Sequence, residues 1–346
     1  MILLTAFSVF FLFGTFIPLI KLDYWWIRVF DYPRFQKLVI QAALISLWWI
    51  FGESQTENWL WTGAHLVASV YLGFLVWPYT VFGKKMIKRV PFDPENGIHL
   101  LIGNVYQYNS DYRKALKLIL RKQPDVVFLV ETHQAWVDHL APLEKEYPHR
   151  ILLPKDNTYG LAFYSKFPIE KQAINNLIDE EIPSIEVVLS LKSGQKITIY
   201  GIHPTPPVPG ENLKSTDRDA EILMVGKKAK ANPMPSLVIG DLNDVAWSYT
   251  TSLFLKISEM ADPRRGRGFY STFHAKIPIF RWPLDHVFLS KHFALSSIRV
   301  QRGIGSDHFP VELKATVTSR KTTEPETATE EEEIIARAKI INGLKE

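Results

Sequence analysis

The chain opens with an apolar, aromatic-rich stretch that fills residues 1–82 and then gives way to sequence of ordinary polarity. Three segments of this stretch, residues 1–20, 37–51 and 59–82, contain few charged side chains. A bilayer core about 30 Å thick requires about 20 mostly apolar helical residues, so the first and third segments are long enough to cross a membrane. The second is short and must extend into its flanks. We therefore expect about three transmembrane helices and contact with the lipid bilayer.

Two other interpretations of this stretch are a cleaved signal peptide and the core of a soluble protein. Residues 1–20 lack a basic start and a small-residue cleavage site, which disfavours a signal peptide. Seven of the ten tryptophans lie near the segment ends, and indole rings prefer the headgroup zone of a bilayer. This distribution favours spanning helices over a soluble core.

The charges of the connections predict an orientation. Residues 21–37 and residues 84–89 each carry four basic side chains, whereas the connection between the second and third segments carries only Glu53 and Glu57. With three spans, the positive-inside rule places the C-terminal region in the cytoplasm. If the second segment does not span, this prediction reverses.

The rest of the chain has the pattern of a soluble α/β protein. Residues 83–97 predict a basic juxtamembrane linker, and residues 98–317 alternate expected strands with expected helices at 111–122 and 219–231. The Thr- and Glu-rich residues 318–346 predict a disordered tail, in which 334–344 could form a short amphipathic helix. The expected strands are 98–105, 125–130, 160–165, 185–191, 197–203, 236–240, 286–289 and 311–317.

The composition excludes several kinds of site. The chain has no cysteine, which rules out disulfide scaffolds, thiolate zinc sites, iron–sulfur clusters and cysteine nucleophiles. Charged residues make up 22% of the chain and the formal net charge is +4. These values fit neither a disordered polymer nor a uniformly basic nucleic-acid binder.

Polar side chains cluster at the ends of the expected strands. A lone carboxylate after a strand is usually a cap or turn residue, but side chains from several strand ends can converge on one rim of a sheet. Hard oxygen donors such as Glu131, Asp241 and Asp307 suit Mg²⁺ or Mn²⁺. In chain order the polar residues are Asn104, Glu131, His203, Asp241, Asn243, Asp285, Asp307 and His308.

Seven motifs carry a family resemblance. They are IGNV at 102–105, DVVFLVE at 125–131, YGLAFYSKFPI at 159–169, YGIHP at 200–204, IGDLN at 239–243, PLDHVFLS at 283–290 and SDHFPV at 306–311. In this order they resemble the endonuclease/exonuclease/phosphatase (DNase-I-like) superfamily, over residues 98–317. The apolar segments ahead of this region, together with HPTPP and PLDH, resemble its bacterial membrane-anchored YafD-like branch. The expected location is therefore the bacterial inner membrane, as a multi-pass protein.

The resemblance implies an α/β (α+β) fold, a four-layered sandwich of two mixed β-sheets flanked by helices. It also implies hydrolysis of phosphoesters with a divalent metal, Mg²⁺ or Mn²⁺. Glu131 would be the principal metal ligand, assisted by Asn104, and Asp307 would bind metal or help to protonate the leaving oxygen.

The same resemblance assigns the remaining catalytic roles. Asp241 would hold and deprotonate the attacking water, and Asn243 would donate to a phosphoryl oxygen. His308, oriented by Asp285, would contact the scissile phosphate, and His203 would be a second phosphate-facing imidazole.

The basic, aromatic stretch at 262–281 bears on the substrate. It fits a flexible loop, contact with a nucleic-acid backbone, or contact with an anionic lipid headgroup. We take Arg264, Arg265 and Arg267, with Tyr159, as candidate substrate-binding residues. Two further residues are expected outside the chemistry: Arg218 on the solvated surface and His286 in a structural role, since strand alternation points it away from the side of Asp285.

Three functions remain open from the sequence. The first is a membrane-anchored, metal-dependent hydrolase of phosphoesters, with lipid-linked phosphates favoured because tethering holds the site near lipid. The second is a membrane-tethered endonuclease or exonuclease, and the third is an inactive binding or scaffold module. No obligate protein partner is predicted.

Overall fold

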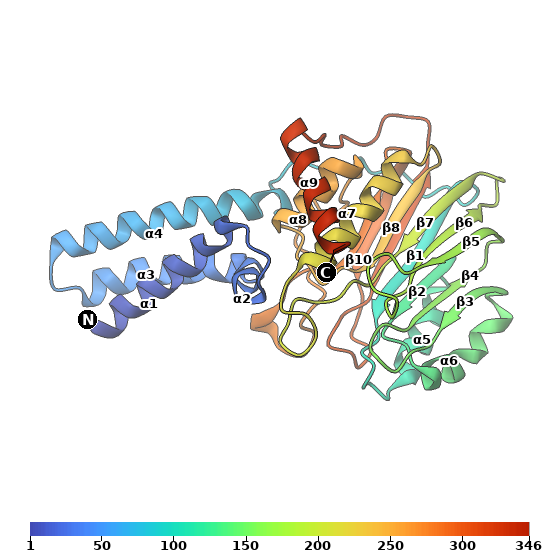
Figure 1. The fold of residues 1–346 in the computed structure, drawn as a ribbon, viewed down its shortest axis with the longest axis horizontal. Coiled ribbons are helices and arrows are strands. Elements are labelled where there is room, and N and C mark those ends of the chain that lie inside the picture. The colour runs from blue at the N-terminus through green and yellow to red at the C-terminus, as the bar shows by residue number, and fades with distance from the viewer. Residues whose placement is uncertain (346) are drawn as a thin grey trace.

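A computed structural model describes residues 1–345 and places a helical bundle at one end of a layered α/β domain (Figure 1). The bundle consists of α1 (Ile2–Phe16), α3 (Arg34–Phe51) and α4 (Gln55–Val76), and the short helix α2 (Trp25–Arg28) lies between α1 and α3. The connection that holds α2 lies against the domain, whereas the turn between α3 and α4 lies at the far end of the bundle.

The bundle carries its apolar side chains on the outside. Ile2 and Phe74 are 86% and 76% exposed, while Trp48 is buried and donates its indole N–H to Ser8 Oγ at 2.9 Å. Two helical stretches, Ile2–Ile20 and Gln55–Tyr79, are long and apolar enough to cross a membrane. The second apolar segment of the sequence forms α3, which packs beside these two helices. It is less apolar than they are and is not among the stretches that could cross a membrane by length and composition.

Eleven strands of the described chain form two mixed sheets. The order is β10-β11-β1-β2-β4-β3 in the six-stranded sheet and β5-β6-β7-β8-β9 in the five-stranded sheet. Within them, β1 is parallel to β2, and β7 is parallel to β8. The strands are β1 (Gly97–Asn104), β2 (Val126–Val130), β3 (His149–Leu153), β4 (Leu161–Ser165), β5 (Ile169–Asn175), β6 (Ser184–Ser190), β7 (Lys196–Gly201), β8 (Ser236–Asp241), β9 (Asp285–Leu289), β10 (Phe293–Val300) and β11 (Val311–Val317).

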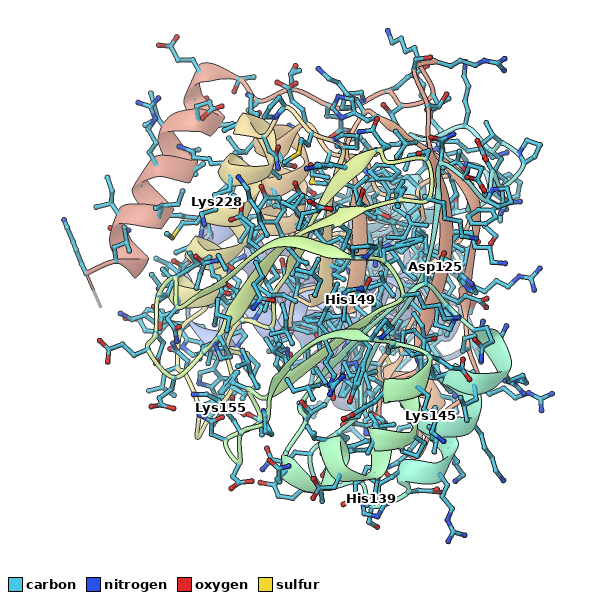
Figure 2. All side chains as sticks on the ribbon, turned by 90° about the vertical axis from the view of Figure 1, so that its right-hand side faces the viewer. Asp125, His139, Lys145, His149, Lys155 and Lys228 are labelled. Carbon is cyan, nitrogen blue, oxygen red and sulfur yellow. The ribbon has the colours of Figure 1, made fainter. Side chains whose placement is uncertain are left out.

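The two sheets pack face to face and helices cover their outer faces, which is the four-layered sandwich that the resemblance implies. Inward side chains such as Phe128 of β2 and Ile239 of β8 share one core between the sheets. Helices α5 (Tyr112–Lys122) and α6 (Gln134–Leu140) cover the six-stranded sheet, and α7 (Thr216–Ala231) and α8 (Tyr249–Ser258) cover the other. Figure 2, seen from the end away from the bundle, shows the two helical layers on opposite sides, marked by His139 and Lys228.

The tail is not disordered throughout, and the short helix expected as an option at 334–344 is present as part of a longer one. Residues 330–343 form α9 (Glu330–Gly343), which packs on α7 and α8 and buries Ala336 in their core. The helix forms because Thr329 and Glu332 make a reciprocal capping box at its start. Lys339 then fixes it to the domain through ion pairs with Asp219 at 2.9 Å and Asp23 at 2.8 Å.

The segment between the bundle and the domain, residues 83–97, runs along the edge of the domain. Ile87 is fully buried, and the backbone N–H of Lys88 donates to the carbonyl of Thr322 at 2.7 Å. The N–H of Val90 donates to the carbonyl of Leu295 in β10 at 2.9 Å. The chain between bundle and domain is therefore held by strand-like contacts on both sides.

Candidate active site

The polar residues that follow β1, β2 and β8 meet at one rim of the sandwich. Asn104 ends β1, Glu131 follows β2 and Asp241 ends β8. The side-chain amide of Asn104 donates to Glu131 Oε1 at 2.5 Å and to Asp241 Oδ2 at 3.0 Å. One amide therefore joins carboxylates that belong to different sheets.

The backbone around these residues is held in unusual conformations. Among the described residues, eight that are not glycine have positive φ, and four of those line the cavity described below: Tyr106, Glu131, Thr158 and Asn243. Such conformations cost free energy and persist where the surrounding structure fixes them, which is common at functional sites. At Glu131 the turn brings the carboxylate back toward Asn104, and the backbone N–H of Gln107 donates to its Oε2 at 3.0 Å.

His308 lies between two buried aspartates. Its Nδ1 is 2.8 Å from Asp285 Oδ2 and its Nε2 is 3.5 Å from Asp241 Oδ2. Burial alone would lower the pKa of His308, but the charges of Asp285 and Asp241 outweigh it and raise the pKa to about 10. The side chain is therefore an imidazolium at neutral pH, with Nδ1–H donating to Asp285.

Asp241 is ionised in this environment. Burial by itself would raise its pKa, but the nearby imidazoles of His308 and His203 hold the pKa below its usual value. His203 Nδ1 lies 3.1 Å from the backbone carbonyl of Asp241, which can only accept a hydrogen bond. Nδ1 therefore carries a proton, and Nε2 takes no part in this contact.

Asn243 is bound from three directions. Its side-chain amide donates to the carbonyl of Pro204 at 2.9 Å. The backbone carbonyl of Asn243 accepts hydrogen bonds from the Tyr32 hydroxyl at 2.8 Å and from Arg218 Nη1 at 2.7 Å. Arg218 is only 2% exposed and pairs with Asp219, so the expectation that it lies on the solvated surface is wrong.

A cavity of about 690 Å³ opens above this cluster. Tyr159 joins it beside His203, at a ring-centroid distance of 5.7 Å. Asp241 and Asp285 are buried behind His308. The rest of the lining is largely apolar and comes from the connection between α1 and α3, the proline-rich loop at residues 204–209 and the loop before β9. The polar lining residues that the sequence analysis named are Asn104, Glu131, Tyr159, His203, Asn243, Asp307 and His308, and the apolar wall includes Trp25, Val29, Pro33, Pro206, Pro207, Phe273, Phe280 and Trp282.

The three arginines expected to bind substrate do not line the cavity. Arg264 is buried and pairs with Asp262, with Nη2 2.7 Å from Oδ2. Arg265 pairs with Glu326, and Arg267 donates to the backbone carbonyl of Ile87. These guanidinium groups bind carboxylates or a backbone carbonyl of the protein itself, so their assignment as substrate-binding residues is wrong.

His286 has the structural role expected of it, because it is fully buried between Arg264 and the Asp244 carbonyl. The site also contains residues that the sequence analysis did not single out. Tyr32 lies 211 positions from the carbonyl that it contacts, and Gln107 acts through its backbone N–H. Neither residue carries a local sequence signal for such a role.

The donor set fits a divalent cation. Asp241, Asp285 and His308 place ligand atoms within 4.8 Å of one another, and all three are buried. His308 is a poor ligand there, because an imidazolium has no free lone pair. Glu131 is the better anchor, because it lines the cavity and because burial raises its pKa, so that its carboxylate needs a counter-charge that no lysine or arginine of the described residues provides. A hard cation bound by Glu131, Asn104 and Asp307 would supply the missing positive charge.

Comparison with known proteins identifies the fold. Residues 103–308 match the model of the Endonuclease/Exonuclease/phosphatase family. TDP2 from D. rerio, solved with a single-strand DNA product, superimposes with a TM-score of 0.54 at 17% identity, covering 64% of this chain and 99% of that one. The family member from Bacteroides vulgatus gives 0.52 at 18% identity over 64% and 99%. The one from Beutenbergia cavernae gives 0.52 at 17% over 64% and 72%.

No curated protein matches the chain. The family match covers the motif residues from Asn104 to His308, and the structural neighbours share the two-sheet sandwich. The chain therefore belongs to the endonuclease/exonuclease/phosphatase family and is a hydrolase of phosphoester bonds.

Proposed function

We propose that this protein is a membrane-attached, divalent-metal-dependent phosphoester hydrolase that acts on lipid-linked phosphates. The observation that carries the proposal is one cavity lined by the Glu131–Asn104 pair and by His308, with an ionised Asp241 held directly behind them by Asn104 and His308. A phosphoester is anionic, so its hydrolysis needs positive charge near the phosphoryl oxygens and a base for the attacking water.

The side chains divide these tasks. Asp241 accepts a proton from water as the water oxygen forms a new bond to phosphorus and the bond to the leaving oxygen breaks. The departing oxygen takes its proton from solvent. His308 donates Nε2–H to a phosphoryl oxygen, and Asp285 keeps it charged and oriented through the 2.8 Å contact at Nδ1. His203 presents a second imidazole nitrogen to the same space.

A divalent cation bound by Glu131, Asn104 and Asp307 would neutralise charge that builds on the phosphate during this step. Oxygen ligands favour Mg²⁺ or Mn²⁺. Asn104 has an orienting part as well, because its amide already holds the carboxylate of Glu131 in place.

Attachment to a membrane is supported by the bundle. In each of the two apolar stretches only 28% of the most apolar window is buried, so most of its side chains face outward rather than into a protein core. If α3 spans as well, both the connection that holds α2 and the catalytic domain lie on one side of the bilayer, which the basic residues at 84–89 assign to the cytoplasm.

Lipid-linked substrates fit the cavity better than nucleic acid. A nucleic-acid backbone is bound through exposed arginines and lysines, whereas the arginines of this region are turned into the fold. The wall facing the catalytic residues is instead aromatic and proline-rich, next to helices with an apolar exterior.

The test uses the full-length protein in detergent with Mg²⁺ and three substrates: a long-chain lipid phosphodiester, bis(4-nitrophenyl) phosphate and plasmid DNA. We expect turnover of the first two and its loss with EDTA. Glu131→Ala should lower kcat by about 10²-fold or more, while Glu146→Ala, which removes an exposed carboxylate, should not. Cleavage of DNA far above the diesters would favour the tethered nuclease, and no turnover at all would favour the scaffold.

A further inference from the structure

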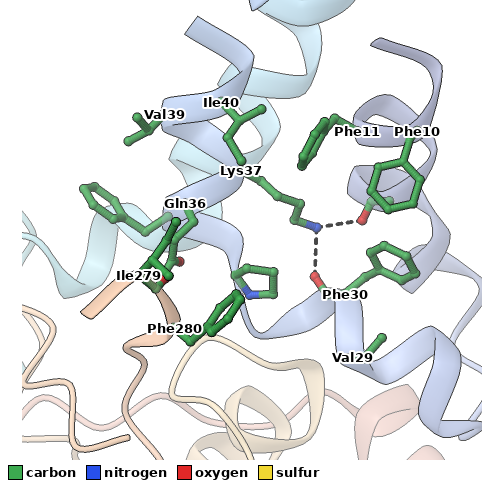
Figure 3. Close-up of a pocket in the computed structure, with 13 residues that line it drawn as sticks. Phe10, Phe11, Val29, Phe30, Gln36, Lys37, Val39, Ile40, Ile279 and Phe280 are labelled. Carbon is green, nitrogen blue, oxygen red and sulfur yellow. Dashed lines mark hydrogen bonds between the residues drawn. The ribbon is translucent and has the colours of Figure 1, made fainter. Parts of the chain in front are cut away.

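A second cavity lies in the bundle, at its domain end (Figure 3). It is a groove of about 460 Å³ between α1 and α3. Phe10 and Phe11 form one wall, Val39 and Ile40 form the other, and Phe280 lies at the end nearest the catalytic domain.

The groove presents almost no polar group to an occupant. Its one charged side chain, Lys37, is only 3% exposed and donates both to the carbonyl of Gly14 at 2.6 Å and to the carbonyl of Phe30 at 2.8 Å (Figure 3). The amide of Gln36 donates to the carbonyls of Ile279 and Arg281 at 3.0 and 3.1 Å. What remains on the surface of the groove is hydrocarbon and aromatic ring.

The groove adjoins the catalytic cavity. Val29, Pro33 and Phe280 line both. A chain of rings connects Phe280 to the catalytic imidazole: Phe280 to Trp282 at 6.0 Å, Trp282 to Phe273 at 5.9 Å, and Phe273 to His308 at 5.0 Å between centroids. An amphiphile with its phosphate at His308 would therefore meet apolar surface all the way to the space between α1 and α3.

We propose that this groove binds the hydrocarbon chain of a single-chain lipid phosphoester during hydrolysis. The inference rests on the proposed function, which places the phosphate at His308, and it adds where the lipid chain lies. The outer walls of the groove, at Phe10 and Val39, are 53% and 56% exposed on helices that we assign to the bilayer, so the chain enters from lipid rather than from water. One groove between two helices accommodates one chain.

Two chromogenic diesters separate the roles of chain and phosphate. They are 4-nitrophenyl hexadecyl phosphate and 4-nitrophenyl ethyl phosphate, which have the same scissile bond and leaving group. Both are assayed with the full-length protein in phosphatidylcholine vesicles with Mg²⁺. The long chain also concentrates the hexadecyl ester in the vesicle, so the two esters cannot be compared directly in the wild type. This partitioning is the same for every variant. The effect of each variant on each ester therefore shows whether the groove binds the chain.

Ile40→Trp fills the groove with a ring, and Val67→Trp places the same ring on the exposed side of α4 as the control. We expect Ile40→Trp to lower kcat/KM for the hexadecyl ester by about 10-fold, because buried hydrocarbon area is lost. Turnover of the ethyl ester should stay within about twofold of the wild type. Val67→Trp should change neither ester.

The outcomes distinguish the two proposals. If the wild type cleaves neither ester, the proposed function fails. If it cleaves both and Ile40→Trp spares the hexadecyl ester, the groove does not bind the chain and the inference is overturned. If Ile40→Trp loses activity on both esters, the same assay is made with Val39→Trp, at a more exposed position. A selective loss of activity on the hexadecyl ester then supports the inference. An equal change in the turnover of both esters refutes it.

Discussion

Glu221 is a carboxylic acid on α7 that the fold buries without a counter-charge. It is 3% exposed, its Oε1 has no hydrogen-bond partner among the described residues, and burial raises its pKa from 4.5 to about 8. The carboxylates of Asp179 and Asp217 add to the shift. Unlike the acids of the catalytic cavity, it contacts no group of the site.

This burial predicts a pH-dependent gain in stability for Glu221→Gln. Between about pH 4.5 and 8 the unfolded chain ionises Glu221 while the folded chain keeps it protonated, so the wild type loses stability as the pH rises through this window. Glutamine does not titrate. We expect the variant to be more stable than the wild type by about 4 kcal/mol at pH 8 and nearly equal at pH 4.5. Thermal unfolding at the two pH values measures the difference in stability between variant and wild type, and Glu180→Gln, at an exposed position, is the control. The same difference at both pH values would contradict the prediction.

The arginines of residues 262–281 show where reasoning from single residues was misleading. A run of basic residues was interpreted as a solvated or ligand-binding loop. However, Arg264 bonds to an aspartate only two positions away, with Nε 2.9 Å from Asp262 Oδ1. A buried arginine must be paired, and that partner was already visible in the sequence as the DPR of Asp262–Arg264.

At the scale of elements, α9 is fixed to the rest of the protein through one partly buried cation. Lys339 Nζ bonds to Asp219 at 2.9 Å, and Asp219 is only 1% exposed. It also bonds to Asp23 at 2.8 Å, in the connection between α1 and α2. A single side chain therefore joins α9, α7 and the base of the bundle.

Lys339→Met should destabilise the protein because it leaves Asp219 with fewer partners for a buried charge. Breaking a buried pair costs about 3–5 kcal/mol, and because Arg218 still neutralises Asp219 we expect about 2 kcal/mol. Thermal unfolding measures the loss against Lys345→Met, which removes an exposed charge just beyond the same helix. An unchanged melting temperature would show that the packing of α9, rather than this ion pair, holds the tail.

The elements that could be predicted are those with a local pattern. The apolar runs of β1, β2, β8 and β11 predicted strands, and the polar residues at their ends predicted the site. By contrast, β5 was missed, because as an edge strand it alternates little and is exposed over most of its length. The helix α9 was expected only as a shorter segment at 334–344, because the acidic composition of its first turn hid the start that the Thr329–Glu332 capping box marks.

Contacts between elements far apart in the chain could not be predicted in this way. Tyr32 and Arg218 meet at the carbonyl of Asn243 only because the bundle and α7 are packed against the same loop. No spacing along the chain records that meeting. The motifs therefore give the chemistry of the site, while its support and its apolar wall depend on the whole structure.

At the scale of the molecule, the bundle forms part of the active site in addition to any role as an anchor. The indole N–H of Trp247 donates to the carbonyl of Asp31 at 2.9 Å, and Arg34 donates to the carbonyl of Trp247. On the other side of the cavity, the N–H of Trp25 donates to the carbonyl of Leu213 at 2.9 Å. The loop that carries Asn243 and the proline-rich loop are thus both held by residues that precede α3 or begin it.

This arrangement predicts that the catalytic domain alone is a poor enzyme even on a water-soluble substrate. A fragment of residues 88–346 lacks the Tyr32 hydroxyl that bonds to the carbonyl of Asn243, and it lacks Trp25 and Val29 from the cavity wall. Displacement of catalytic groups by about 1 Å can cost about 10²-fold in rate, so we expect kcat/KM for 4-nitrophenyl ethyl phosphate to fall on the order of 10²-fold.

The comparison is made with the full-length protein in detergent, and circular dichroism verifies that the fragment is folded. Tyr32→Phe in the full chain, which removes only the hydroxyl, should give a smaller loss in the same direction. Full activity of a folded fragment would mean that the bundle only tethers the enzyme. The loops at Asn243 and Leu213 would then hold their positions without it, and the apolar wall would matter for the lipid chain alone.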